Sequence, residues 1–188
     1  DRAPAGLPRI AAWAGLTAAG LLMAGGDPRR TYGESGLAKA LTGATTGDGG
    51  LICRTPAAQA EAILLLAMLN CVYEARRIEM PAPIRDTLAS LVPPLLGCRM
   101  GDGGLSSWQG GRPIDDATIR AIIAASGVRT RPLSQARDWG YQRLASGSTV
   151  LVFDAAPPPL GRVSERGCAS TFAFELSDGD HRLVVNCG

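Results

Sequence analysis

The sequence predicts an α+β chain, with a helical part over residues 1–131 and antiparallel β hairpins over residues 132–188. The pentapeptide Gly-Asp-Gly-Gly-Leu occurs at 47–51 and again at 101–105, with helix-patterned sequence between the copies. A turn repeated at that distance indicates one helical hairpin per repeat, so the first part is expected to be a helical array. After about Trp139 the periodicity becomes that of strands. Two architectures in one chain predict two domains.

Five helices are expected before residue 131. The uncharged segment Ile10–Gly26 falls short of the roughly 20 strongly apolar residues that a bilayer needs, so we expect a buried helix there. Pro93–Pro94 is expected to kink the fourth helix or end it early, because proline has no N–H to donate. The expected spans are Pro8 to the Gly25–Pro28 turn, about Glu34 to Leu41, about Pro56 to Arg77 after an N-cap at Thr55, a stripe from Ile84 to Leu95, and Asp115 to Gly127.

Two β hairpins are expected in the second part. Tyr141–Leu144 and Thr149–Asp154 flank the turn at 145–148. Asp178-Gly179, a strong two-residue turn signal, separates Phe172–Leu176 from His181–Asn186. The expected register pairs Glu175 with Arg182, Phe174 with Leu183, and Phe172 with Val185. Two hairpins are too few for a stable β domain, so the chain is interpreted as a piece of something larger.

Composition excludes several classes of function. The net charge of +2 arises from 19 basic and 17 acidic side chains spread without blocks, which gives no electrostatic case for nucleic acid. The five cysteines are irregularly spaced and His181 is the only histidine, so neither a metal site nor a cofactor is expected. Asp1–Pro4 is not a basic start followed by an apolar run, so no signal peptide is visible.

Three stretches resemble the heparinase II/III family of polysaccharide lyases. They are Asp48–Pro56, then Gly101–Leu105 with Trp108-Gln109-Gly110, and the run from Gly140 through Phe153–Pro157 and Phe174–Leu176 to Val184–Gly188. The likeness covers nearly the whole chain. It implies the end of an (α/α) toroid followed by the start of a β-sandwich-like domain.

The resemblance also implies a mechanism and a setting. Lyases of this type cleave uronic-acid polysaccharides by β-elimination: a polar or cationic group neutralises the uronate carboxylate, a Tyr or His removes the C5 proton, and an acid assists the leaving oxygen. The cleft between toroid and sandwich holds the sugar chain. The implied partners are an acidic, uronate-containing polysaccharide and the remaining parts of the same protein. The implied location is the bacterial periplasm or cell envelope.

The chain departs from the family pattern at three positions. Leu51 and Thr55 stand where such relatives commonly have His and Asn, and Cys168 stands in place of a His. Leucine cannot transfer a proton. A thiol can, but its ordinary pKa of about 8.5 fits the task less well.

Tyr141 and Cys168 are the candidate catalytic residues. Tyr141 begins a strand at the expected domain junction, and packing is its alternative role. Cys168 lies in the long connection from Ala155 to Ser170, with no histidine or lysine near it in sequence. Tyr73 is interpreted as a core residue whose hydroxyl is hydrogen-bonded. His181 is interpreted as a residue at the end of a strand.

Five polar or aromatic residues are candidate substrate contacts: Asp48, Arg54, Asp102, Trp108 and Gln109. The two aspartates could touch sugar hydroxyls or simply cap their turns. The place of Arg54 just before a helix N-terminus favours a carboxylate partner, in a substrate or in the protein. Trp108 and Gln109 suit a sugar ring and its hydroxyls, or helix packing.

Three functions follow from these patterns. The first is a heparinase II/III-type lyase, incomplete in this chain. The second is a non-catalytic glycan-binding or cell-envelope scaffold that kept the fold and lost the chemistry. The third is a small membrane protein anchored through Ile10–Gly26.

Overall fold

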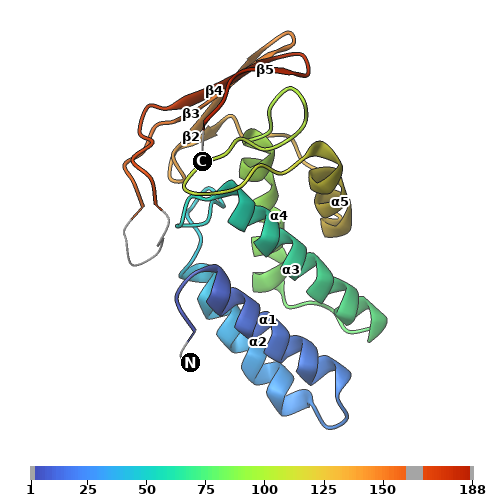
Figure 1. Ribbon diagram of the computed structural model, residues 1–188. Coiled ribbons are helices and arrows are strands. Elements are labelled where there is room, and N and C mark those ends of the chain that lie inside the picture. Colours follow the sequence, from blue (N-terminus) through green and yellow to red (C-terminus); the bar gives the residue numbers. More distant parts are fainter. Residues whose placement is uncertain (1–2, 160–166, 187–188) are drawn as a thin grey trace.

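The computed structural model describes residues 3–159 and 167–186 and confirms the α+β class. Figure 1 shows α1 and α2 as a hairpin at one end, α3 and α4 beside them, and the sheet across the opposite end. The helices are α1 (Leu7–Leu22), α2 (Asp27–Thr42), α3 (Pro56–Ala75), α4 (Ala82–Gly97) and α5 (Asp116–Ser126). The strands are β1 (Gln135–Ala136), β2 (Tyr141–Ser146), β3 (Thr149–Asp154), β4 (Phe174–Asp178) and β5 (His181–Val184).

The two helical expectations that fail concern α2 and α4. The second helix begins at Asp27, with Pro28 in its first turn, rather than near Glu34. The fourth continues through Pro93 and Pro94 to Gly97. The two prolines remove the N–H donors of the Ala89 and Ser90 carbonyls without ending the helix, and the Pro93 carbonyl also accepts from the Leu133 N–H at 2.9 Å. At α5 the expectation is confirmed, with Asp115 capping the Thr118 N–H at 2.8 Å and Gly127 in the left-handed region.

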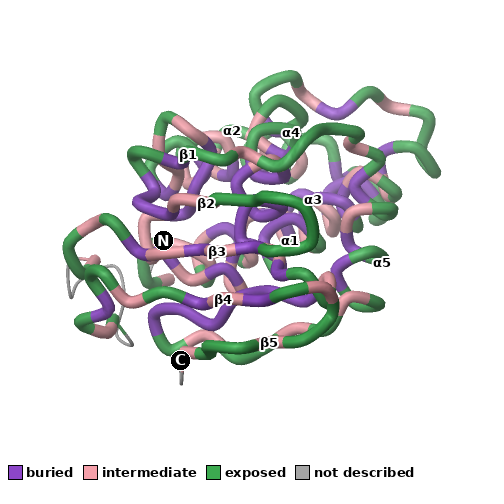
Figure 2. The backbone as a smooth tube through the Cα atoms, turned by 90° about the horizontal axis from the view of Figure 1, so that it is seen from above, coloured by how far each residue is buried: buried purple, intermediate pink, exposed green. Residues whose placement is uncertain are grey.

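The sheet is a meander in the order β1-β2-β3-β4-β5, all antiparallel. The first hairpin forms as expected. The register expected for the second is wrong, because Asp178 pairs with His181, so that the loop is Gly179-Asp180 and Ser177 faces Arg182. A bulge between Leu176 and Ser177 then places Leu176 opposite Val184. Phe174 pairs instead with Phe153 of β3, and Phe172 lies outside the strand at φ 68°. Figure 2 shows that much of β3 and β4 is buried while β5 is mostly exposed.

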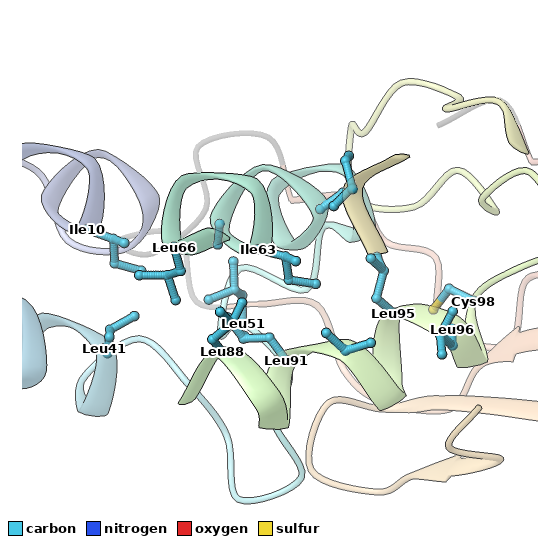
Figure 3. Close-up of a cluster of buried hydrophobic side chains, with 14 of the residues drawn as sticks. Ile10, Leu41, Leu51, Ile63, Leu66, Leu88, Leu91, Leu95, Leu96 and Cys98 are labelled. Carbon is cyan, nitrogen blue, oxygen red and sulfur yellow. The ribbon is translucent and has the colours of Figure 1, made fainter. Parts of the chain in front are cut away.

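One apolar cluster joins the helices to the inner face of the sheet. Figure 3 shows its helical part, in which the labelled side chains of Leu51, Leu88 and Leu91 lie together. The α1 helix is packed among α2 and α3, as expected for the Ile10–Gly26 segment. By length and composition alone α3 could cross a membrane, but half of its apolar window is buried against other helices.

Both copies of the pentapeptide form the same turn. In each, an isolated bridge closes the loop, Thr45 with Leu51 and Arg99 with Leu105. The third residue of each copy has positive φ, 85° at Gly49 and 79° at Gly103, which glycine adopts without steric cost. The sequence repeat is therefore a structural repeat of one turn.

The aspartates of the two turns hold the sheet layer against the helices. One oxygen of Asp48 accepts from the Thr46 hydroxyl at 2.6 Å, and the other accepts from the N–H groups of Asp138 and Trp139 at 2.8 and 3.1 Å. Both oxygens of Asp102 accept from the Arg182 guanidinium, at 2.9 and 3.0 Å. Burial alone would raise the pKa of Asp102, but the Arg182 bonds and charge lower it below its usual range. Each aspartate therefore shapes its turn and also contacts the sheet layer.

The first turn is pressed against α4 at a point where only glycine fits. A Cβ at Gly49 would lie 2.0 Å from the Ser90 carbonyl oxygen, which has no intrahelical donor because the residue four places on is Pro94. We expect Gly49→Ala to lower the free energy of unfolding by more than about 3 kcal/mol, since left-handed strain and a backbone clash add. Denaturant unfolding of the purified protein measures this loss.

Gly147→Ala is the matched control. Gly147 also has positive φ, at 56°, but nothing lies within 4 Å of a Cβ built there. It should lose only the strain, about 1–2 kcal/mol. Equal losses for the two variants would show that the contact with Ser90 does not constrain the turn.

Candidate functional site

The helices and the sheet meet at a contact, called here the seam, that is centred on the buried ion pair between Arg54 and Asp154. Arg54, which follows the first turn, places its guanidinium on the Asp154 carboxylate at the end of β3. The Arg54 side chain is 7% exposed and that of Asp154 is 0% exposed. Arg54 Nε also donates to the Trp139 carbonyl at 2.8 Å, and Nη1 donates to that of Pro157 at 2.6 Å. The carboxylate partner that the sequence requires for Arg54 is thus in the protein itself.

Tyr141 lies against this pair. The Arg54 guanidinium carbon is 5.1 Å from the centre of the Tyr141 ring, and the Tyr141 hydroxyl donates to the Arg54 carbonyl at 2.6 Å. Trp139 packs edge-on against the same ring, with centroids 4.8 Å apart. Burial raises the pKa of Tyr141 well above its ordinary value. The phenol is therefore held neutral and bonded.

Gln109 links the pair to the loop that carries Cys168. Its amide nitrogen donates to Asp154 at 3.2 Å and to the Ser170 hydroxyl at 2.8 Å, and its oxygen accepts from the Cys168 N–H at 2.7 Å. Ser170 in turn donates to Asp154 at 2.7 Å. Gln109 and Arg54 both have positive φ, 55° and 58°. Such strain costs about 1–2 kcal/mol per residue, and here both strained residues converge on one carboxylate.

Trp108 is fully buried and packs on Tyr141, with ring centroids 5.7 Å apart. Its indole N–H has no hydrogen-bond partner among the described residues. A ring in this position offers no face to a sugar from solvent. Packing is therefore the role that its geometry supports.

Five of the seven candidates from the sequence meet in this seam, and two do not belong to its centre. Asp48 reaches its edge through the Trp139 N–H, and Asp102 sits with Arg182 and Glu175 at a second polar contact. Burial raises the pKa of Glu175, although it accepts from the Ser107 N–H at 2.7 Å. The five that meet are Arg54, Trp108, Gln109, Tyr141 and Cys168.

Three further residues carry polar contacts: Asp154 and Ser170 in the seam, and Gln59 between the first pentapeptide turn and α4. The sequence pattern predicts only a strand end at Asp154 and a loop end at Ser170, with no bond between them. Gln59 was not considered, yet it is fully buried and bonds the Leu51 N–H at 2.8 Å, the Gly49 carbonyl at 3.1 Å and the Leu91 carbonyl at 2.7 Å. A glutamine inside the apolar surface of a helix was the available signal, because buried amides must be satisfied.

Two of the positions that depart from the family pattern, Leu51 and Thr55, make contacts within the protein. Leu51 is 1% exposed and belongs to the apolar core. Thr55 precedes α3 but makes no capping bond, and its hydroxyl instead approaches the Gln109 carbonyl at 3.3 Å.

Tyr73 is buried and donates to Glu34 at 2.7 Å, which confirms the core interpretation. Among residues 3–159 and 167–186, no three His, Cys, Asp or Glu side chains gather as metal ligands; Cys187 lies outside these ranges.

Comparison with known proteins gives a family match for the C-terminal part of the chain and a fold for the whole of it. Residues 128–188 match the family Heparinase II/III-like, C-terminal. FtsZ-localized protein C of Caulobacter vibrioides (strain NA1000 / CB15N) is 32% identical over 189 residues, covering 100% of this chain and 32% of that protein. The chain thus spans about a third of the length of this curated relative.

Solved structures of heparinases share the fold at low identity. A mutant of heparan sulfate lyase HepC from Pedobacter heparinus has a TM-score of 0.77 at 18% identity, covering 96% of this chain and 32% of that one. Heparinase III has a TM-score of 0.76 at 11% identity, covering 97% of this chain and 35% of that one. The C-terminal part of the chain therefore matches the Heparinase II/III-like, C-terminal family over residues 128–188, and the chain has the fold of about a third of these enzymes.

Proposed function

We propose that the protein containing this chain uses its heparinase II/III-like fold as a non-catalytic scaffold. The main support for this proposal is the burial and hydrogen bonding of the Tyr141 hydroxyl. A base for β-elimination must reach the C5 proton and accept it. The Tyr141 hydroxyl is instead buried, donates to the Arg54 carbonyl, and has a pKa raised by burial. A tyrosinate is disfavoured in this place.

The histidine of the chain is badly placed to replace it. The sheet register puts Tyr141 opposite Asp154 at one end of the strands and puts Thr149, Asp178 and His181 together at the other end. The His181 side chain is 83% exposed beside a hairpin turn. Cys168 is then the remaining candidate for proton transfer near the seam, and its backbone N–H donates to the Gln109 side-chain oxygen at 2.7 Å.

The named relative supports a role defined by location. FtsZ-localized protein C matches the whole chain at 32% identity. Its name describes where that protein is found in the cell and mentions no catalytic activity. We therefore propose that the present protein also localises with FtsZ, which differs from the periplasmic setting implied by family resemblance alone.

A polysaccharide lyase is the second candidate function. The C-terminal family match and the similarity to heparinase structures favour it. In this case the helices belong to an (α/α) toroid, the sheet to a β sandwich, and an acidic, uronate-containing glycan is the substrate. Cys168 would have to transfer the proton, because Tyr141 is bonded within the seam.

The two functions are separated by a lyase assay on the protein at its natural length. Heparan sulfate, heparin and alginate are incubated with it, and the ultraviolet absorbance of unsaturated uronyl ends is followed. We expect no increase above the protein-free reaction, while a heparinase run alongside gives full signal. Product formation that Cys168→Ala abolishes, with unfolding unchanged, would establish the lyase instead.

Localisation is tested by fluorescence microscopy in the source bacterium. A fluorescent fusion of the whole protein should coincide with labelled FtsZ and disperse when FtsZ is depleted. The same fusion with Gly147→Ala, a change at an exposed turn, should behave like the wild type. A signal that is uniform or independent of FtsZ would rule out the proposed location.

A further inference from the structure

A cavity of about 550 Å³ lies between α5 and the start of the second pentapeptide turn. This volume falls within the range of about 300–1,000 Å³ that is usual for ligand sites. The cavity lies apart from the seam that holds Tyr141 and Cys168. Its lining, called here the arginine pocket, consists of Arg99, Arg120, Ile123, Ala124, Gly127, Val128 and Arg129.

The charge of the arginine pocket is positive. Arg99 is held by a bond from Nε to the Gly103 carbonyl at 2.8 Å and by an ion pair with Asp116. Arg120 shares that carboxylate, with Nε at 2.8 Å. Arg129 is exposed and has no ion pair among the described residues. Three guanidinium charges thus face one carboxylate and the roughly half unit of negative charge at the end of α5.

The apolar part of the pocket is aliphatic. Ile123 and Val128 are half-buried and pack on the main core, and Ala124 lies beside them. No aromatic side chain lines this cavity, whereas sugar rings commonly pack on aromatic faces. Guanidinium groups match carboxylates in geometry as well as in charge. The lining therefore suits carboxylates attached to an aliphatic chain better than it suits a pyranose.

We propose that the arginine pocket docks an acidic peptide segment of a partner protein, in which Asp or Glu alternates with aliphatic residues. Charge complementarity selects this occupant. The aliphatic side chains would lie over Ile123 and Val128 while the carboxylates reach Arg120 and Arg129. This goes beyond the scaffold role by giving it a protein partner, and it does not depend on whether the seam is catalytic.

The test is calorimetric titration of the whole protein with a capped peptide in which Glu and Asp alternate with Leu and Ile. Control peptides carry Gln and Asn in place of the acids, or Ser in place of the aliphatics. We expect binding of the acidic peptide alone, weakening as salt is added. The Arg120→Ala, Arg129→Ala double variant should bind about tenfold more weakly, as two exposed ion pairs allow.

A matched variant removes the same charge elsewhere. Arg29→Ala with Arg85→Ala, on the exposed faces of α2 and α4, should leave the affinity unchanged. Equal binding of acidic and neutral peptides, or equal weakening by both double variants, would overturn the proposal. So would arginine-dependent binding of a heparin oligosaccharide in the absence of peptide binding, since the pocket would then be a glycan site.

Discussion

The buried contact between Arg54 and Asp154 is the constraint on which the arrangement of the two layers depends. Each partner is taken almost wholly out of water, which costs several kcal/mol per charge unless other bonds compensate. Compensation comes from the Trp139 and Pro157 carbonyls, which accept from Arg54, and from Gln109 and Ser170, which donate to Asp154. Because these bonds span distant parts of the chain, the helices and the sheet are held in one relative position.

The same constraint shapes the functional argument. The candidate residues Arg54 and Tyr141 are bonded within the protein, so that the guanidinium neutralises the Asp154 carboxylate and the phenol donates to the Arg54 carbonyl. The aspartates of the repeated turns add two further contacts between the layers, through the Trp139 amide and through Arg182. A fold shared with lyases thus carries a seam in which Arg54, Asp154, Gln109 and the Tyr141 hydroxyl are bonded to protein groups, and an open positive surface lies elsewhere, beside α5.

Local signals in the sequence predicted local structure well. Asp115 and Gly127 marked the ends of α5, and the repeated pentapeptide marked two identical turns, because capping and left-handed glycine depend on neighbouring residues alone. The second hairpin forms, but its register differs from the expected one, since the loop is Gly179-Asp180 rather than Asp178-Gly179 and a bulge lies between Leu176 and Ser177. The partner of Arg54 could not be predicted, because Asp154 is distant in sequence and only the folded chain brings the two together.

A double-mutant cycle on Arg54→Met and Asp154→Asn tests the central role of this pair most directly, by denaturant unfolding of the whole protein. Each single change should cost about 3–5 kcal/mol, because it leaves the other partner buried without its counter-charge. The double variant should cost clearly less than the sum, with a coupling energy of about 2 kcal/mol or more. Additive losses, with coupling below about 0.5 kcal/mol, would contradict the account, since the two layers would then be held together by other contacts.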